Sequence, residues 1–197
     1  MTNPIKLGIA GLGTVGIGVV KIIQQKAETL QARAGRNIEI VAVSAKSKNK
    51  DRGIDLSMYD WESDPVTLAN RKDIDIFVEL IGGHVGAAKN SIFAAIDNEK
   101  HIVTANKALL AHHGQQLAEK TENKNKLLRF EAAVAGGIPV IKALTEGLAG
   151  NNLTRVVGVM NGTCNYILTR MQSSGLSYDE IFKEAEALGY LEADPNL

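Results

Sequence analysis

Several residue types are scarce in this sequence of 197 residues, and each scarcity excludes a class of protein. A single cysteine, Cys164, rules out a disulfide within the chain and fits a reducing compartment. Lys and Arg (22) balance Asp and Glu (22), so no excess of positive charge favours a nucleic-acid partner. The N-terminus lacks the apolar core of a signal peptide, and no apolar run reaches the ~18 residues of a membrane span. These absences predict a cytoplasmic protein without a nucleic-acid or membrane partner.

Aromatic residues are also few, with four Phe, four Tyr and one Trp. The core must therefore consist of Ile, Leu, Val and Ala, which is typical of parallel sheets covered by helices. Strand-like and helix-like stretches alternate up to residue 132, and this order predicts an α/β fold with a doubly wound, parallel, Rossmann-type sheet. The range 44–65 is polar and irregular in pattern. The expected strands are 5–10, 38–43, 74–81, 101–104 and 127–132, and the expected helices are 14–34, 85–98 and 107–123.

The pattern changes near residue 136, where we expect a domain boundary. Residues 1–135 are predicted to form an NAD(P)-binding Rossmann domain, and 136–197 to form part of an α+β substrate-binding and dimerisation domain. One strand cannot form a sheet alone, so the second region is interpreted as incomplete, with a strand edge that favours self-association. Its expected elements are a helix from Pro139 to about 148, a Val-rich strand over 153–160, a helix to about 172, and a final helix that starts at the capping box Ser177-Tyr178-Asp179-Glu180.

A glycine-rich sequence, Gly11-Leu12-Gly13-Thr14-Val15-Gly16, follows the first expected strand and opens the first expected helix. In a dinucleotide-binding turn the first glycine allows the tight turn, the second lets a pyrophosphate approach, and the third lets helix and strand pack closely. The helix N-terminus then faces the phosphates. The alternative is a glycine turn that only links a strand to a helix.

The end of the second expected strand bears on the choice of cofactor. No Asp or Glu lies between Val41 and Lys50, whereas an acidic residue there would bind the ribose 2′-hydroxyl of NAD. Lysines, including Lys46, are interspersed with hydroxyl and amide side chains instead, which favours the 2′-phosphate of NADP. The alternative is a solvated lysine loop.

The sequence Thr104-Ala105-Asn106-Lys107 follows a short expected strand, at the sheet edge where open α/β folds bind ligands. Asn106 is suited to cap the next helix. Lys107 then falls in the first helical turn, where the helix dipole disfavours a cation. A lysine that breaks a local rule beside a cofactor crevice is a candidate site residue. An exposed lysine with its stem lying on the helix is an equal alternative.

Two further segments have a functional and a structural interpretation. The turn 130–139 is rich in small residues, and its carbonyl oxygens could bind a hard monovalent cation or simply form a tight crossover. Glu192 and Asp194, after the expected helix end at Gly189, could bind a substrate ammonium group, act as acid or base, or form a polar loop. We expect Cys164 to be a buried small hydrophobe, and the four histidines show no metal-ligand spacing.

Together these segments resemble homoserine dehydrogenase. The resemblance is carried, in the family's order, by Gly11-Leu12-Gly13-Thr14-Val15-Gly16, Thr104-Ala105-Asn106-Lys107, Glu131-Ala132-Ala133-Val134-Ala135-Gly136-Gly137-Ile138-Pro139, Asn161-Gly162-Thr163-Cys164-Asn165-Tyr166-Ile167-Leu168 and Leu188-Gly189-Tyr190-Leu191-Glu192-Ala193-Asp194-Pro195. The last three are far more specific than the glycine motif. The resemblance implies NADP-dependent (alternatively NAD-dependent) interconversion of L-aspartate 4-semialdehyde and L-homoserine, on the route to threonine, methionine and isoleucine.

The resemblance also implies site residues. Gly11, Gly13, Thr14, Val15, Gly16, Lys46, Thr104 and Lys107 would bind the cofactor, and Lys107 would be catalytic at its junction with the substrate. Main-chain oxygens of Glu131, Val134, Gly136 and Ile138 would bind sodium, and Glu192 would bind the substrate amino group. The family is expected to form homodimers or larger homo-oligomers.

One departure from the family concerns the end of the chain. The family continues past the Asp-Pro pair with an aspartate and a proton-transferring lysine, whereas this sequence stops at Leu197. The chain is therefore expected to be an N-terminal fragment with little activity alone. Two other readings stay open: another semialdehyde or amino-acid dehydrogenase, and a non-catalytic NADP-binding regulatory module.

Overall fold

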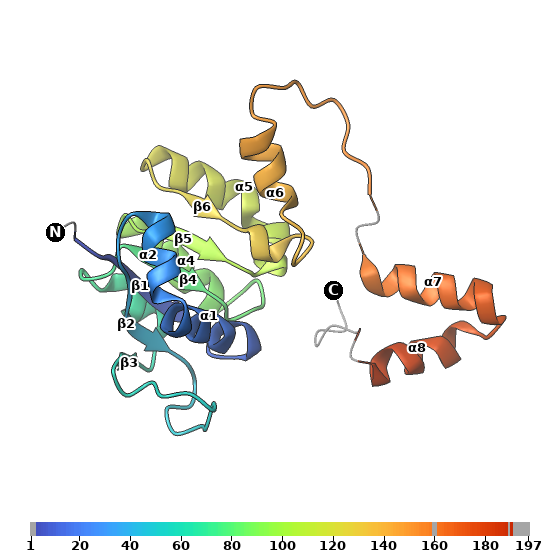
Figure 1. Cartoon of the computed structure of the whole chain (residues 1–197), viewed down its shortest axis with the longest axis horizontal. Coiled ribbons are helices and arrows are strands. Elements are labelled where there is room, and N and C mark those ends of the chain that lie inside the picture. Colours follow the sequence, from blue (N-terminus) through green and yellow to red (C-terminus); the bar gives the residue numbers. More distant parts are fainter. Residues whose placement is uncertain (1–2, 159–160, 189, 191–197) are drawn as a thin grey trace. The chain divides into compact units, whose positions relative to one another are not determined.

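A computed structural model describes residues 3–158, 161–188 and 190, and the chain forms two compact units, Met1–Gly147 and Leu148–Leu197. The first unit is built on a sheet of six parallel strands in the order β3-β2-β1-β4-β5-β6 (Figure 1). This strand order is that of dinucleotide-binding folds. Successive strands are added on one side of β1 up to β3, and from β4 on they are added on its other side. The strands are β1 Ile5–Ala10, β2 Ile38–Ser44, β3 Asp60–Glu62, β4 Ile76–Glu79, β5 His101–Thr104 and β6 Leu128–Arg129.

Helices cover both faces of this sheet (Figure 1), and the predicted doubly wound architecture is confirmed. Neighbouring strand residues belong to opposite core clusters, as the period of two in a strand requires. Ala10 and Phe77 pack with α3, α4 and α5, whereas Ile9 and Val78 pack with α1. The helical segments of the first unit are α1 Thr14–Gln25, α2 Ala27–Ala34, α3 Pro65–Asn70, α4 Ala87–Asp97, α5 Lys107–Asn123, the 3₁₀ turn η1 Glu131–Ala133, α6 Val140–Lys142 and the π-helical turn η2 Ala143–Gly147.

The structure differs from the expected elements of the first unit in five places. The strand expected over 127–132 is confined to Leu128–Arg129, because the chain turns into the 3₁₀ segment Glu131–Ala133, and the helix α3 was not expected. The long helix expected over 14–34 is divided at Lys26, which ends α1 and precedes α2, although no glycine or proline marks the break. The range 44–65, expected to be irregular, contains the edge strand β3, which pairs in parallel with Ala42, Val43 and Ser44 of β2. The helix expected from Pro139 is a short α6 that continues as the π turn η2.

The described part of the second unit contains two helices, α7 Gly162–Ser174 and α8 Tyr178–Ala187. Ile167, Ile181 and Ala185 form their small buried core. The capping box that predicts the start of α8 is confirmed, because Ser177 and Glu180 each satisfy a backbone N–H of the other.

The strand expected over 153–160 is wrong for its described part. Residues 152–158 form no strand and are exposed to solvent, and 159–160 lie outside the described residues. A strand needs a partner for its backbone N–H and C=O groups, and this unit has no described strand to supply one. The argument for self-association through a strand edge here therefore falls.

Candidate cofactor and catalytic site

The turn between β1 and α1 uses its three glycines in different ways. Gly11 has a φ of +99°, and a Cβ there would lie 2.3 Å from the carbonyl oxygen of Leu80. A Cβ on Gly16 would lie 1.9 Å from the carbonyl oxygen of Gly11. A Cβ on Gly13 would meet no atom within 4 Å. Packing therefore requires glycine at the first and third positions, whereas the second faces open space.

Gly13 is also the N-cap residue of α1, and it has no side chain to satisfy the helix's first N–H groups. The turn follows Ala10, and Ala10 pairs with Glu79 at the carboxyl end of β4. An uncapped helix N-terminus at the reversal point of a parallel sheet is suited to bind the phosphates of an anionic ligand.

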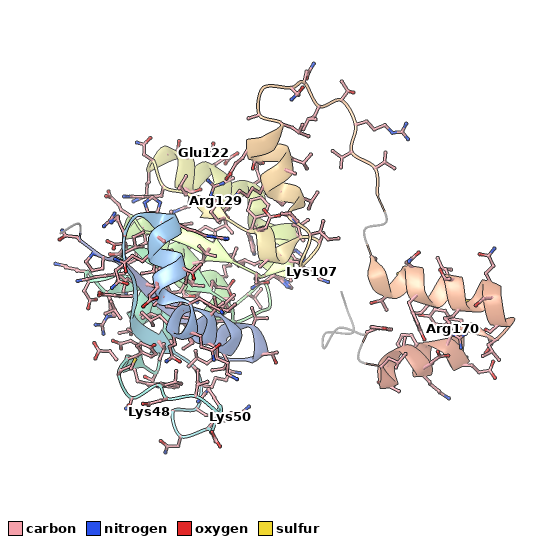
Figure 2. All side chains as sticks on the ribbon, in the orientation of Figure 1. Lys48, Lys50, Lys107, Glu122, Arg129 and Arg170 are labelled. Atoms are coloured by element: carbon pink, nitrogen blue, oxygen red, sulfur yellow. The ribbon has the colours of Figure 1, made fainter. Side chains whose placement is uncertain are left out.

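The carboxyl end of β2 presents a hydroxyl and several cations. Ser44 is 2% exposed, and among the described residues its Oγ is the one buried side-chain polar atom without a hydrogen-bond partner. Lys46, Lys48 and Lys50 are exposed on the following loop, where Figure 2 labels the last two. This loop has the charge expected of a site for an anionic group.

Arg52 is a residue of this region that the sequence did not single out. Its guanidinium donates to the carbonyl oxygens of Ser47 (2.6 Å), Lys50 (2.9 Å) and Leu12 (3.3 Å). It also lies over the ring of Trp61, 5.4 Å from the ring centre. Arg52 therefore ties the lysine loop to the glycine turn. Lysines dominate this stretch of sequence, so no local pattern distinguishes the arginine.

The segment after β5 lies at the same edge of the sheet. The predicted cap is confirmed, because the Asn106 side chain accepts from the N–H of Leu109 (3.0 Å) and α5 begins at Lys107. Lys107 is exposed at this first position, and Figure 2 labels it. Thr104, in contrast, is fully buried and accepts from the backbone N–H of Asn106 (3.0 Å).

Glu79 is the second residue that sequence reasoning missed. It is a fully buried carboxylate at the end of β4, and the Thr104 hydroxyl donates to it at 2.6 Å. The signal was available, because an acidic residue inside the apolar run Ile76-Phe77-Val78-Glu79-Leu80-Ile81 contradicts the pattern of a buried strand.

The turn expected to bind a cation follows β6. The Glu131 carboxylate accepts from the N–H groups of Lys142 (2.8 Å) and Ile141 (3.1 Å), so it caps α6. The main-chain oxygens of Glu131 and Ile138 each accept one backbone hydrogen bond, which leaves each a second lone pair. Neutral carbonyl oxygens are ligands that suit a hard cation. The donor set of the turn thus fits such an ion.

The described part of the second unit corrects one expectation. Cys164 is exposed, not buried: it lies in the first turn of α7, and the small core formed by Ile167, Ile181 and Ala185 does not include it. In the same unit Glu184 accepts from the hydroxyl of Tyr166 and from Arg170, and the Arg170 guanidinium lowers the pKa of Glu184. Glu192 and Asp194 lie outside the described residues.

Three of the four histidines lie together, which their spacing did not predict. His84 stacks on His112 with ring centres 3.9 Å apart, and a ring nitrogen of His113 lies 3.1 Å from the carbonyl oxygen of His84. Within the described ranges, no group of three His, Cys, Asp or Glu side chains is placed to hold a metal ion.

The sequence matches two models of known protein families. Residues 11–131 match the family described as "Homoserine dehydrogenase, NAD binding domain", and 139–197 match "Homoserine dehydrogenase". The chain belongs to the homoserine dehydrogenase family. The first match lies within the first compact unit, and the second match covers the end of that unit and the whole of the second.

Almost the whole chain is similar to homoserine dehydrogenases of known sequence and structure, and it spans less than half the length of three of them. Those of Neisseria gonorrhoeae and Pseudomonas aeruginosa are 48% and 45% identical over 98% of this chain, which spans 44% of each relative. The structure of the Thiobacillus denitrificans homoserine dehydrogenase matches with a TM-score of 0.89 at 42% identity, over 98% of this chain and 44% of that one.

A more distant relative was solved with a cofactor. The structure of a hyperthermophilic archaeal homoserine dehydrogenase in complex with NADPH matches with a TM-score of 0.80 at 26% identity, over 98% of this chain and 64% of that one. Among the described residues of this chain, none of the helices is long and apolar enough to cross a membrane.

Proposed function

We propose that this chain is the NADP(H)-binding portion of an enzyme that interconverts L-aspartate 4-semialdehyde and L-homoserine, a step towards threonine, methionine and isoleucine. The observation that carries the proposal is the convergence at one sheet edge of an uncapped helix N-terminus at Gly13 with the segment that ends in Lys107. Within this family, such an edge is where a nicotinamide cofactor would lie.

Each part of this edge has a distinct task in the proposed reaction. The N–H groups of Gly13, Thr14 and Val15 bind the pyrophosphate, with Gly11 and Gly16 shaping the turn. When bound, the nicotinamide accepts or supplies the hydride. Lys107 stabilises negative charge on the substrate oxygen while the carbonyl carbon is reduced, and Thr104 holds the segment that presents it.

The 2′-phosphate of NADP would bind at the end of β2. Lys46 supplies a cation there, and Ser44, two residues earlier, supplies a buried hydroxyl that has no hydrogen-bond partner among the described residues. NADPH in the related archaeal structure supports this choice over NAD.

The remaining assignments concern substrate, ion and assembly. Glu192 binds the substrate ammonium group, and the oxygens of Glu131, Val134, Gly136 and Ile138 bind sodium. We place the functional boundary near residue 135, between the two family matches. A cytoplasmic homodimer or larger homo-oligomer is supported by the single cysteine and by exposed apolar side chains in 153–157.

The cofactor assignment is tested by titrating the chain with NADPH and with NADH at one salt concentration. Binding is measured by fluorescence or by calorimetry. NADPH should bind more tightly. Lys46→Ala should reduce the difference between the two by about 1–2 kcal/mol, the contribution of a charge-assisted hydrogen bond. Lys183→Ala, which removes an exposed lysine from α8, is the matched control and should change neither affinity. Equal affinities for NADPH and NADH in the unmodified chain would refute the assignment.

A further inference from the structure

Glu79 is a buried acidic side chain whose surroundings are built to hold it. It is 0% exposed, and four neutral donors reach its carboxylate. The hydroxyl of Thr104 donates to Oε2 at 2.6 Å, whereas Oε1 accepts from the N–H groups of Ile81 (2.8 Å) and Gly82 (3.3 Å) and from the Asn106 side chain (3.4 Å). Burying a carboxylate costs free energy unless such hydrogen bonds are made, so Glu79 is not an ordinary core residue.

The donors come from two different loops. Ile81 and Gly82 belong to the loop after β4, whereas Thr104 and Asn106 belong to the segment after β5. Asn106 adds a direct link, because its Nδ2 donates to the carbonyl oxygen of Gly83 at 2.7 Å. Glu79 is thus the centre of a network that fixes one loop against the other.

The glycine-rich part of the first loop is loosely packed, although Leu80 at its start packs closely against Gly11. Gly82, Gly83 and Gly86 all have positive φ values, between +64° and +85°, and a Cβ on any of them would meet no atom within 4 Å. Close packing therefore does not hold these three glycines, and glycines leave many other conformations accessible. The N–H groups of Ile81 and Gly82 are held by the Glu79 carboxylate.

The second segment is connected directly to the candidate catalytic lysine. The Oδ1 atom of Asn106 caps α5, and its Nδ2 donates to Gly83 and Glu79. One side chain therefore caps the helix and fixes the position of its first turn relative to the loop after β4. Lys107 is the next residue. A displacement of Asn106 would displace Lys107 with it.

We propose that Glu79 is a positioning residue of the cofactor site, which holds the loop 80–83 and the N-terminus of α5 in the geometry that receives the nicotinamide end of the cofactor. This proposal rests on the proposed function. Glu79 itself is covered and acts through Thr104 and Asn106.

The test uses three variants of the chain. Glu79→Gln keeps the size but replaces the acceptor at Oε2 with a donor, so the Thr104 hydroxyl can no longer donate there and has to reorient. Asn106→Ser keeps a good helix cap but loses the bonds to Gly83 and Glu79. Thr121→Val is the matched control, because Thr121 is a buried threonine of the same helix α5 whose hydroxyl bonds only the carbonyls of Leu117 and Ala118 among the described residues.

Two measurements separate positioning from general stability. Hydrogen exchange should accelerate about tenfold or more at the amides of Ile81 and Gly82 in Glu79→Gln, since their acceptor is weakened, and by less in Thr121→Val. The Kd for NADPH should rise about tenfold in Glu79→Gln and several-fold in Asn106→Ser, but remain unchanged in Thr121→Val. The effects of Glu79→Gln and Asn106→Ser on Kd should not add, because both break one network.

The outcomes are distinct for the two proposals. If the unmodified chain binds no NADPH, the proposed function fails, while the exchange result still reports whether Glu79 holds the loop. If NADPH binds equally well to the unmodified chain and to Glu79→Gln, or if the exchange of Ile81 and Gly82 is unchanged, the positioning role is wrong. Should Glu79→Gln not fold, unchanged NADPH affinity in Asn106→Ser would overturn the proposal by itself.

Discussion

At the residue scale, the three glycines of the turn before α1 differ in what a methyl group would meet. Gly16→Ala should prevent α1 from packing, since its Cβ would lie 1.9 Å from a backbone oxygen that has little room to move. We expect the free energy of unfolding to fall by ~3 kcal/mol or more. Gly13→Ala places its methyl group in open space, so the fold should survive while NADPH binding weakens about tenfold or more. Urea unfolding and NADPH titration of both variants make the comparison. Equal loss of stability in both would contradict it.

Lys107 supports a second residue-scale prediction, for catalysis. In a full-length homoserine dehydrogenase that carries this sequence, Lys107→Ala should lower kcat/KM by ~100-fold or more, the scale of a lost electrostatic group. Stability should change little, because Lys107 is exposed at the start of α5. Steady-state kinetics with homoserine and NADP, beside a thermal melt, measure both. Kinetics equal to those of the unmodified enzyme would make Lys107 a surface residue only.

At the element scale, the edge strand β3 is held by ion pairs that centre on Arg71. Its guanidinium contacts Asp73 (2.6 Å), Asp60 (2.7 Å) and Glu62 (2.9 Å). The hydrogen bond from Arg71 lowers the pKa of Asp73 and raises that of Arg71 itself. β3 is only three residues long and two of them are acidic, so Arg71 both fixes it and offsets part of its negative charge.

Stability should therefore depend on pH through Asp73. Its pKa is lower in the folded chain than the ordinary value of 3.8, so its contribution is complete above about pH 4–5 and is lost as the pH falls further. Arg71→Met should cost about 1–2 kcal/mol at pH 7, a modest value because Asp60 and Asp73 are well exposed, and less at pH 2.5. Lys120→Met, which removes one exposed ion pair with Asp97, is the control and should cost less than about 1 kcal/mol. Urea unfolding at both pH values measures the difference, and an Arg71→Met effect independent of pH would contradict it.

The elements that could be predicted from the sequence were those with a strong local signal. Apolar runs of Val and Ile identified β1, β2 and β4, and the side chains of Asn106 and Ser177 marked two helix starts. The strand β3 could not be predicted, because its stability comes from pairing with β2 and from Arg71, both distant in sequence. The Val-rich range 153–158 showed the opposite: strong strand propensity formed no strand where no described partner was available.

At the scale of the whole molecule, the division at Gly147 leaves the whole six-stranded sheet and its main core clusters in the first unit. All of the proposed cofactor contacts lie in the first unit. Residues 1–147 alone should therefore fold and bind NADPH with an affinity within about threefold of that of the whole chain. Circular dichroism and NADPH titration of the shortened chain test this. An unfolded product, or one that does not bind while the whole chain does, would show that the second unit completes the first.

The candidate site was only partly visible in the sequence. The glycine turn and the segment 104–107 could be located because each follows an expected strand, and parallel strands bring their carboxyl ends to one edge. Glu79 and Arg52 could not be assigned a role, because each acts on a loop distant in sequence, through Thr104 in one case and Leu12 in the other. Such contacts become visible only when the strands are placed side by side.

The separate units also make the chain its own reference for ligand screening. A ligand that binds only the folded first unit raises the melting temperature of that unit by mass action. If the two units melt independently, the transition of the second reports buffer, salt and heating-rate effects in the same sample, since none of the proposed cofactor contacts lies in it. The difference between the two transitions would then measure cofactor occupancy alone, so cofactors could be ranked without an activity assay.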